Sequence, residues 1–267
     1  MHKILRPLFP VLAFFILASC ATVPLTERKT LSLVSDSEML SLSAQQYREV
    51  LKETKLSTNP AQTAMVQQVG QRIAGASEAF MREAGRAEEI KDFRWEFNLL
   101  ENDQMVNAFC MPGGKVGVYT GILPVASGEA GLAVVIGHEV AHAIAKHGNE
   151  RMSQAMMVQM GGIGLSLALA QKPAATQDLF LSVYGIGTGV GFTLPYSRIQ
   201  ETEADRIGLV LMAKAGYDPH AAVSLWERMN KTGGPRPPEI LSTHPAPESR
   251  IRDIQNMIPE AMKYYKK

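Results

Sequence analysis

Apolar residues recur at helical spacing over most of this chain and at strand spacing over one short region. Before residue 85 the pattern predicts two helices, at about residues 38–53 and 59–84. The second helix carries an apolar stripe whose members are three or four positions apart, which places them on one helix face. These residues are Met65, Val69, Ile73 and Ala76.

The period of the pattern changes to two between residues 93 and 119. Apolar and polar residues alternate over residues 93–99 and again over residues 115–119, as they do along half-buried strands. Residues 106–110 are predicted to be extended, and the Pro-Gly-Gly sequence at 112–114 is predicted to turn the chain. These segments predict a small antiparallel sheet within a mainly helical protein, and therefore an α+β fold.

Helical patterns resume at residue 129 and continue almost to the C-terminus. One helix is predicted over residues 129–147, and two uncharged, glycine-rich stretches follow at 152–171 and 179–197. Both are long enough to span a bilayer, but Gln154, Gln159 and the glycines favour packed helices or contact with a membrane surface. Further helices are predicted at about 195–215, from 218 to near 233, and at about 248–257. Residues 38–267 are therefore interpreted as one domain.

The first twenty residues have the layout of a secretory leader. A short basic region with Lys3 and Arg6 precedes an apolar run, residues 8–18, that is too short to span a bilayer. The run ends in Leu-Ala-Ser-Cys, which resembles the bacterial lipobox and makes Cys20 the predicted lipidation site. An ordinary secretory leader that contains a cysteine is the alternative. Residues 1–19 are thus predicted to be a signal peptide, and residues 20–37 a lipidated cysteine with a tether.

Composition and charge exclude several classes of protein. Hydrophobic residues make up 46% of the chain and charged residues 20%, as in ordinary globular proteins. The formal net charge of +1 becomes about −1 when Lys3 and Arg6 leave with the leader, so there is no electrostatic argument for nucleic acid as a partner. If Cys20 carries lipid, Cys110 has no disulfide partner and is interpreted as a small buried hydrophobic residue.

The strongest chemical signal is the sequence His-Glu-Val-Ala-His at residues 138–142. Two histidines four positions apart share one helix face, so His138 and His142 can bind one zinc ion. Zinc lowers the pKa of a bound water, and Glu139 can take the proton of that water and pass it to a leaving amine. The alternative is that both histidines belong to the core and bind no metal.

A catalytic zinc site needs a third protein ligand. His147 lies five residues past His142, on the far side of a continuous helix, and is expected to be a surface residue or a residue of the last turn that favours the helix dipole. The better candidate is Glu201, which shares a face with Asp205 if this segment is helical, whereas Glu203 points elsewhere. In this hypothesis Glu201 binds zinc and Asp205 accepts the N–H of a ligand histidine. On composition alone, a solvated acidic helix face explains these residues equally well.

Residues 197–205, Ser-Arg-Ile-Gln-Glu-Thr-Glu-Ala-Asp, and the helix with the HExxH motif resemble one known family. It is the CAAX-prenyl-protease and HtpX-like family of gluzincin zinc metallopeptidases, in particular its periplasmic lipoprotein branch. The likeness runs from about residue 98 to residue 251. It implies a mainly helical gluzincin domain with the small antiparallel sheet beside the HExxH helix. It also implies one zinc ion per chain, with Glu201 as a ligand and Asp205 supporting a ligand histidine.

Two further motifs extend the resemblance. The strand motif of the family appears as Asn107, Ala108 and Phe109 followed by Cys-Met-Pro-Gly-Gly, and it implies a strand edge to which substrate backbone adds as another strand. The Thr-His-Pro sequence at 243–245, followed by Arg-Ile at 250–251, implies that His244 lies near the zinc. There it either stabilises the oxyanion of the reaction or closes the site as a fourth ligand. A loop histidine without a role is the alternative.

The function that these residues favour is zinc-dependent endopeptidase activity. The resemblance implies substrates among misfolded or unassembled periplasmic and outer-membrane proteins. With Ala21 after the cysteine, it also implies anchoring by lipid at Cys20 in the outer membrane of a Gram-negative bacterium, facing the periplasm. The alternative is a chaperone-like envelope lipoprotein that does not cleave. The complete HExxH motif and Glu201 argue against this alternative, because a binding protein has no need of a catalytic base.

Overall fold

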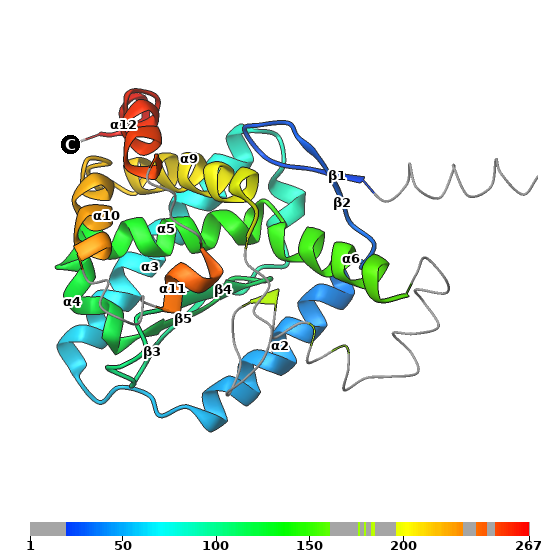
Figure 1. Ribbon diagram of the computed structural model, residues 1–267, viewed down its shortest axis with the longest axis horizontal. Helices are drawn as coiled ribbons and strands as arrows, with labels where there is room; N and C mark the ends of the chain where they lie inside the picture. Colours follow the sequence, from blue (N-terminus) through cyan, green and yellow to red (C-terminus); the bar gives the residue numbers. More distant parts are fainter. Residues whose placement is uncertain are drawn as a thin grey trace, which may run out of the picture.

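The computed structural model describes residues 20–160, 176, 179, 183, 184, 196–231, 239–244 and 249–266. Helices make up most of this part of the chain, with two small sheets (Figure 1). The α-helices are α2 (Asp36–Glu53), α3 (Pro60–Glu83), α4 (Leu123–Ala126), α5 (Glu129–Ile144), α6 (His147–Met160), α9 (Arg198–Lys214), α10 (Ala221–Lys231), α11 (Glu239–Thr243) and α12 (Arg250–Ala261). The strands are β1 (Cys20–Thr22), β2 (Lys29–Leu31), β3 (Glu96–Leu100), β4 (Ala108–Met111) and β5 (Lys115–Tyr119). The predicted α+β class is confirmed.

The larger sheet is mixed, whereas an antiparallel sheet was expected. Its strand order is β3-β5-β4, with β4 antiparallel to β5 and β3 parallel to β5. The chain crosses over after β3 and pairs β4 with β5 through the predicted turn at 112–114. This order leaves β4, the strand of the Asn-Ala-Phe motif, at the edge of the sheet that contacts α5.

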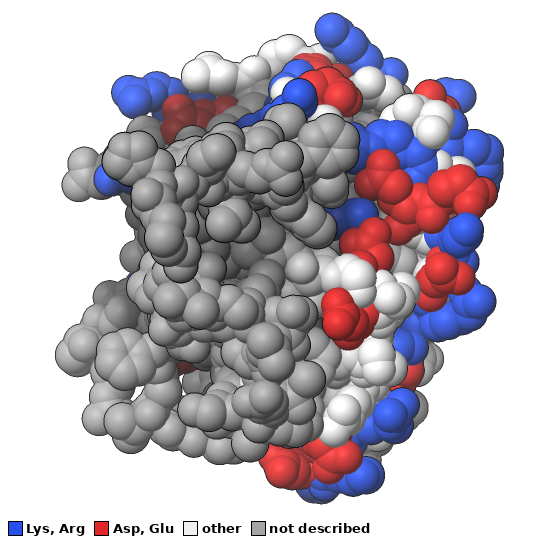
Figure 2. All heavy atoms as spheres, turned by 90° about the vertical axis from the view of Figure 1, so that its right-hand side faces the viewer, with Lys and Arg blue, Asp and Glu red and all other residues white. Residues whose placement is uncertain are grey.

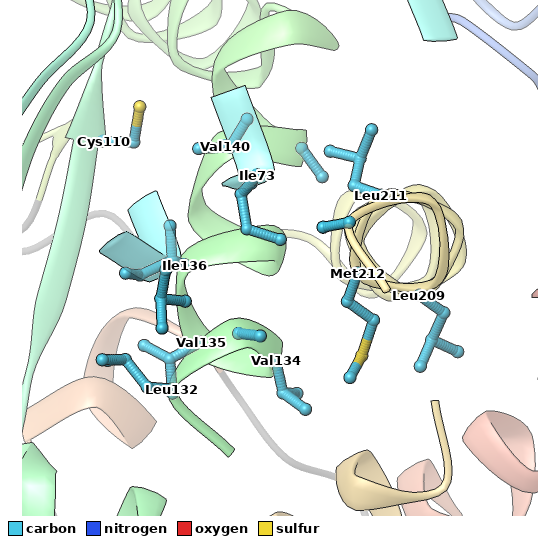
Figure 3. Packing of buried hydrophobic residues seen from close by; sticks show 14 of the residues in the cluster. Ile73, Cys110, Leu132, Val134, Val135, Ile136, Val140, Leu209, Leu211 and Met212 are labelled. Carbon is cyan, nitrogen blue, oxygen red and sulfur yellow. The ribbon is translucent and has the colours of Figure 1, made fainter. Parts of the chain in front are cut away.

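Helix α5 lies at the centre of the core. Every residue from Gly131 to Ile144 is buried, because α9 packs along one side of α5 while α3 and the sheet cover the other (Figure 1). Figure 3 shows Ile136 and Val140 of α5 between Cys110 of β4 and Leu211 of α9. Cys110 is 2% exposed, so its predicted burial is confirmed.

The long helix predicted for residues 129–147 is two helices. Helix α5 ends at Ile144, and Lys146 has the left-handed backbone conformation, with φ at 58°. Helix α6 then begins at His147 in a new direction. The break follows from a single residue outside the right-handed helical region, which the apolar pattern does not reveal.

Residues 20–37 are more ordered than the tether expected for them. Strands β1 and β2 form an antiparallel pair, in which Cys20 is opposite Leu31. Helix α2 begins two residues earlier than expected, at Asp36, because Ser35 and Glu38 form a reciprocal capping box. The N-terminal segment therefore packs on the domain. The predicted signal peptide, residues 1–19, lies outside the described residues.

No single helix among the described residues is both long and apolar enough to cross a membrane. One pair of helices, Thr120–Ala126 and Glu129–Ile144, is long and apolar enough when the two are taken together, but the pair is bent by 120°. The glycine-rich stretches considered as spans, 152–171 and 179–197, fall largely outside the described residues. Over the described part of the face in Figure 2, basic and acidic side chains are interspersed, so no field of one sign forms there.

Candidate metal centre

Three segments that are distant in sequence bring four potential metal ligands together. His138 and His142 lie one turn apart on α5, Glu201 lies in the first turn of α9, and His244 follows α11. One ligand atom from each residue lies within 4.8 Å of the other three, and all four residues are buried. The structure thus brings together the three predicted ligands and His244.

Local sequence places Glu201 and Asp205 on the helix face that meets α5. Ser197 starts α9 through a capping box with Gln200, so the helix begins where the motif requires. One turn beyond Asp205, Gly208 lies against α5. A β-carbon at Gly208 would be 3.0 Å from the backbone nitrogen of His138, so a larger residue would require the two helices to shift by a few tenths of an ångström. Because the two helices are close together, the carboxylate of Glu201 on α9 can reach the two histidines on α5.

The donor atoms have the spacing of a tetrahedral zinc site. His138 Nε2 lies 3.0 Å from His142 Nε2 and 3.2 Å from His244 Nδ1. Glu201 Oε1 lies 3.3 Å from His142 Nε2 and 2.9 Å from His244 Nδ1. A tetrahedron with metal–ligand bonds of about 2.0–2.1 Å has edges of about 3.3 Å. Three imidazole nitrogens and a carboxylate oxygen also match the ligand chemistry of zinc, so these residues fit the ion.

Asp205 and Arg250 support the ligands from the side of α9 and α12. Asp205 Oδ1 lies 2.9 Å from His138 Nδ1, the ring nitrogen that faces away from the other ligands. Arg250 donates to both oxygens of Asp205, at 2.8 and 2.9 Å, and its Nη1 lies 2.8 Å from Glu201 Oε2. Its guanidinium stacks 3.7 Å above the ring of Trp226. Arg250 was seen in the sequence only as part of a motif and was given no role.

His147 is buried beside the site, so its expected position at the surface is wrong. It is 0% exposed, and its Nδ1 lies 2.9 Å from Nδ1 of His142. Its Nε2 lies 3.1 Å from Glu203 Oε2. The expectation assumed one continuous helix, whereas the break at Lys146 turns His147 back toward His142. Glu203 does point away from the ligand cluster, as expected, but it is buried against His147.

Burial and neighbouring charges set the protonation of the cluster. Burial opposes the charged form of His138, but Glu201 and Asp205 outweigh it and raise its pKa to about 9. In His142 burial prevails and holds the pKa well below its usual range. Burial also disfavours an ionised Glu201, yet His244 and His138 lower its pKa well below the ordinary value. An ionised carboxylate and a neutral imidazole are the forms that bind metal, and zinc takes the place of the proton that the carboxylates favour on His138.

Glu139 lies next to the cluster without belonging to it. Its side chain is 4% exposed, and Oε1 is 3.4 Å from Nε2 of His244. Burial raises the pKa of its carboxyl, although His244 and His138 oppose that shift. A carboxyl with a raised pKa can both take and return a proton near neutral pH. Tyr196, which sequence reasoning missed, stacks on His142 with ring centroids 3.8 Å apart.

The strand motif lies beside the site, on the edge strand β4. Ala108 and Cys110 face the core around α5, whereas the ring of Phe109 lies on the opposite face of the sheet, near Tyr47. The carbonyl of Val106, just before this strand, accepts a hydrogen bond of 3.1 Å from the backbone N–H of Ile240 in α11. The helix that precedes His244 is therefore attached to the beginning of the edge strand.

Comparison of the sequence with known proteins identifies the family of this chain. The model of peptidase family M48 matches residues 60–258. The chain is 36% identical over 244 residues to the mitochondrial metalloendopeptidase OMA1 of Schizosaccharomyces pombe, covering 90% of this chain and 66% of that protein. It is 30% identical over 273 residues to the OMA1 of Saccharomyces cerevisiae, covering 99% and 76%. It is 28% identical over 245 residues to the β-barrel assembly-enhancing protease of Escherichia coli K12, covering 89% and 47%. The chain thus spans between about half and three quarters of the length of these relatives.

These matches correct one prediction and confirm another. The predicted location, lipid-anchored in the outer membrane of a Gram-negative bacterium and facing the periplasm, is wrong, because the relatives with the higher identities are mitochondrial proteins. That prediction depended on about twenty residues with a generic basic and apolar pattern, which many targeting segments share. The prediction of a zinc-dependent endopeptidase is confirmed by the family match together with the ligand cluster. This chain belongs to peptidase family M48 and is a zinc metalloendopeptidase.

Proposed function

We propose that this enzyme cleaves misfolded or unassembled proteins within their chains, as a quality-control protease. The observation that carries the proposal is the buried cluster of His138, His142 and Glu201 with Glu139 beside it. A further support is the relative from Escherichia coli, whose name links it to the assembly of β-barrels. Unassembled chains expose backbone that can pair with a strand edge, whereas folded proteins hide it.

In this proposal His138, His142 and Glu201 hold the zinc, and Asp205 keeps His138 in the tautomer whose Nε2 faces the metal. Zinc held by these residues would lower the pKa of water and polarise the carbonyl of the scissile bond. Glu139 takes the proton of the attacking water and returns it to the leaving amine, for which its raised pKa is suited. The peptide bond is thereby split by addition of one water.

The substrate backbone is proposed to add to β4 along Asn107, Ala108 and Phe109. This strand is at the sheet edge and contacts the helix that carries Glu139. Recognition would then depend on main-chain hydrogen bonds, since the ring of Phe109 lies on the far face of the sheet. Such recognition suits a protease with many different substrates.

We further propose that His244 closes the site in this conformation. Its Nδ1 lies in the fourth corner of the ligand tetrahedron, 2.9 Å from Glu201 Oε1 and 3.2 Å from His138 Nε2. A zinc ion with four protein ligands has no position for water and is inert. Because α11 is attached to Val106 before the edge strand, a substrate that enters along β4 would displace α11 and His244 together.

The runner-up function is a chaperone-like protein that binds such chains without cleaving them. Both hypotheses use the strand edge, but only the protease needs Glu139 at the metal. The deciding experiment compares the purified protein with its Glu139→Gln variant, in metal content and in cleavage of casein. We expect both proteins to contain one zinc ion per chain, and only the wild type to cleave. Equal cleavage by the two proteins, or none by either, would refute the proposed role of Glu139.

Membrane attachment through lipid at Cys20 is also proposed, on the strength of the Leu-Ala-Ser-Cys sequence. Lipid at Cys20 would hold the enzyme near membrane-associated substrates. One lipid chain gives only marginal binding, so stable attachment requires a second chain or another membrane contact.

A further inference from the structure

An arginine of the N-terminal hairpin reaches the interior of the peptidase domain. Arg28, just before β2, forms a bidentate ion pair with Glu203 of α9, with nitrogen–oxygen distances of 2.8–3.1 Å. The same guanidinium donates to both oxygens of Glu150 in α6, at 2.7 and 2.8 Å. Thr26 of the hairpin adds a hydrogen bond of 2.7 Å to Glu203. Both glutamates are buried, so Arg28 supplies the charge that allows them to be ionised there.

Glu203 is connected to the metal centre through His147. Its Oε2 lies 3.1 Å from His147 Nε2, and His147 Nδ1 lies 2.9 Å from His142 Nδ1. When Nε2 of His142 binds zinc, its Nδ1 carries the proton and donates to Nδ1 of His147. Nε2 of His147 then carries a proton and donates to Glu203. Every donor in this series has an acceptor, in the one arrangement of protons that also leaves Nε2 of His142 free for the metal.

We propose that Arg28 is a positioning residue of the zinc centre, which orients the ligand His142 through Glu203 and His147. The inference depends on His142 being a zinc ligand. The arrangement parallels that at the other ligand histidine: His138 contacts Asp205, and Asp205 is paired with Arg250. The two ligand histidines are thus each held by a carboxylate paired with an arginine, directly for His138 and through one imidazole for His142.

The consequence is that the segment next to Cys20 is part of the functional centre. Residues 20–31 lie before the region that matches the family model, which begins at residue 60. Arg28 is nevertheless linked to the metal position through the side chains of Glu203, His147 and His142. A force applied at Cys20, or displacement of the hairpin by another molecule, would therefore change the orientation of the zinc ligand His142.

The test measures zinc affinity, by competition with a chromogenic chelator, for Arg28→Ala, Arg28→Lys and His147→Leu in the full chain. Loss of a residue that orients a metal ligand weakens metal binding by roughly 10- to 100-fold. We expect losses of zinc affinity in this range for Arg28→Ala and His147→Leu. The loss should be smaller for Arg28→Lys, which keeps the positive charge but cannot form the bidentate pair. The matched control is Arg206→Ala, which removes a bidentate pair with Glu260 at 2.7 and 2.8 Å, away from the ligands.

A second readout separates positioning from general stability. The visible spectrum of the cobalt-substituted protein reports ligand geometry, and it should change in Arg28→Ala but not in Arg206→Ala. If Arg28→Ala does not fold, Glu203→Gln, which keeps shape and removes charge, serves in its place. Zinc affinity and cobalt spectrum identical to those of the wild type would overturn the proposal, even if the thermal midpoint fell. Glu201→Ala is measured alongside, because retention of zinc there would refute the ligand assignment instead.

Discussion

Replacing Gly208 by alanine tests whether the close approach of α5 and α9 builds the zinc centre. A β-carbon at Gly208 would lie 3.0 Å from the nitrogen of His138 and 3.1 Å from the carbonyl carbon of Gly137. Ordinary contacts between such atoms are about 3.5–4.0 Å. These neighbours are backbone atoms of a buried helix, which cannot swing aside as a side chain does. The two helices must therefore separate, and Glu201 moves away from the histidines with α9.

The magnitude follows from two opposing effects. Overpacking of this kind costs about 1–3 kcal/mol. Alanine in place of a helical glycine gains about 1 kcal/mol of helix propensity. Gly75 of α3 isolates the second effect, because nothing lies within 4 Å of a β-carbon placed there. The difference in unfolding free energy between Gly208→Ala and Gly75→Ala is then about 1–3 kcal/mol, the overpacking cost alone.

The assay combines thermal unfolding with zinc titration of both variants. For a domain of this size, each kcal/mol shifts the midpoint by about 2–4 °C, so the two variants should differ by roughly 2–12 °C. Gly75→Ala should unfold at or above the wild-type temperature with unchanged zinc affinity. Gly208→Ala should unfold below Gly75→Ala and bind zinc more weakly. If the two variants match in both measurements, the contact between α5 and α9 does not set the ligand geometry.

Three further substitutions have definite expected results. Arg250→Leu leaves Asp205 and Glu201 buried without their cation, so the unfolding free energy should fall by roughly 3–5 kcal/mol in denaturant titrations, and an unchanged value would contradict the pairing. His244→Ala should retain zinc and raise basal cleavage of a peptide if His244 closes the site; a fall in kcat of roughly 10²–10³ would assign it to the oxyanion instead. Cys20→Ala should be released from membranes by a carbonate wash with its zinc affinity intact, because Arg28 remains in place; retention on the membrane would show another attachment.

Local spacing was sufficient to select His138 and His142, whereas selecting Glu201 and Asp205 also needed the family resemblance, because a solvated acidic face explained them equally well. His138 and His142 share a face because they are four residues apart, and the same holds for Glu201 and Asp205. The predicted α+β class needed only the switch of the apolar pattern from helical to strand spacing. The ordering of the strands was beyond this reasoning, because periodicity says which residues form a strand and not which strands are neighbours.

The sequence by itself indicated the candidate metal chemistry of this protein: the paired histidines His138 and His142, Glu139 between them, and, through the family resemblance, Glu201. Only the tertiary structure decided how those faces are supported. One left-handed residue, Lys146, turned His147 from the expected surface position into the core. Arg28 and Arg250 reach the same centre from opposite ends of the chain; no sequence pattern indicated Arg28, and the motif that contains Arg250 did not reveal its contacts. The physical reason is that ligand identity depends on spacing within one helix, whereas burial of the supporting charges depends on contacts between distant segments, 45 residues apart for Arg250 and Asp205 and 175 for Arg28 and Glu203.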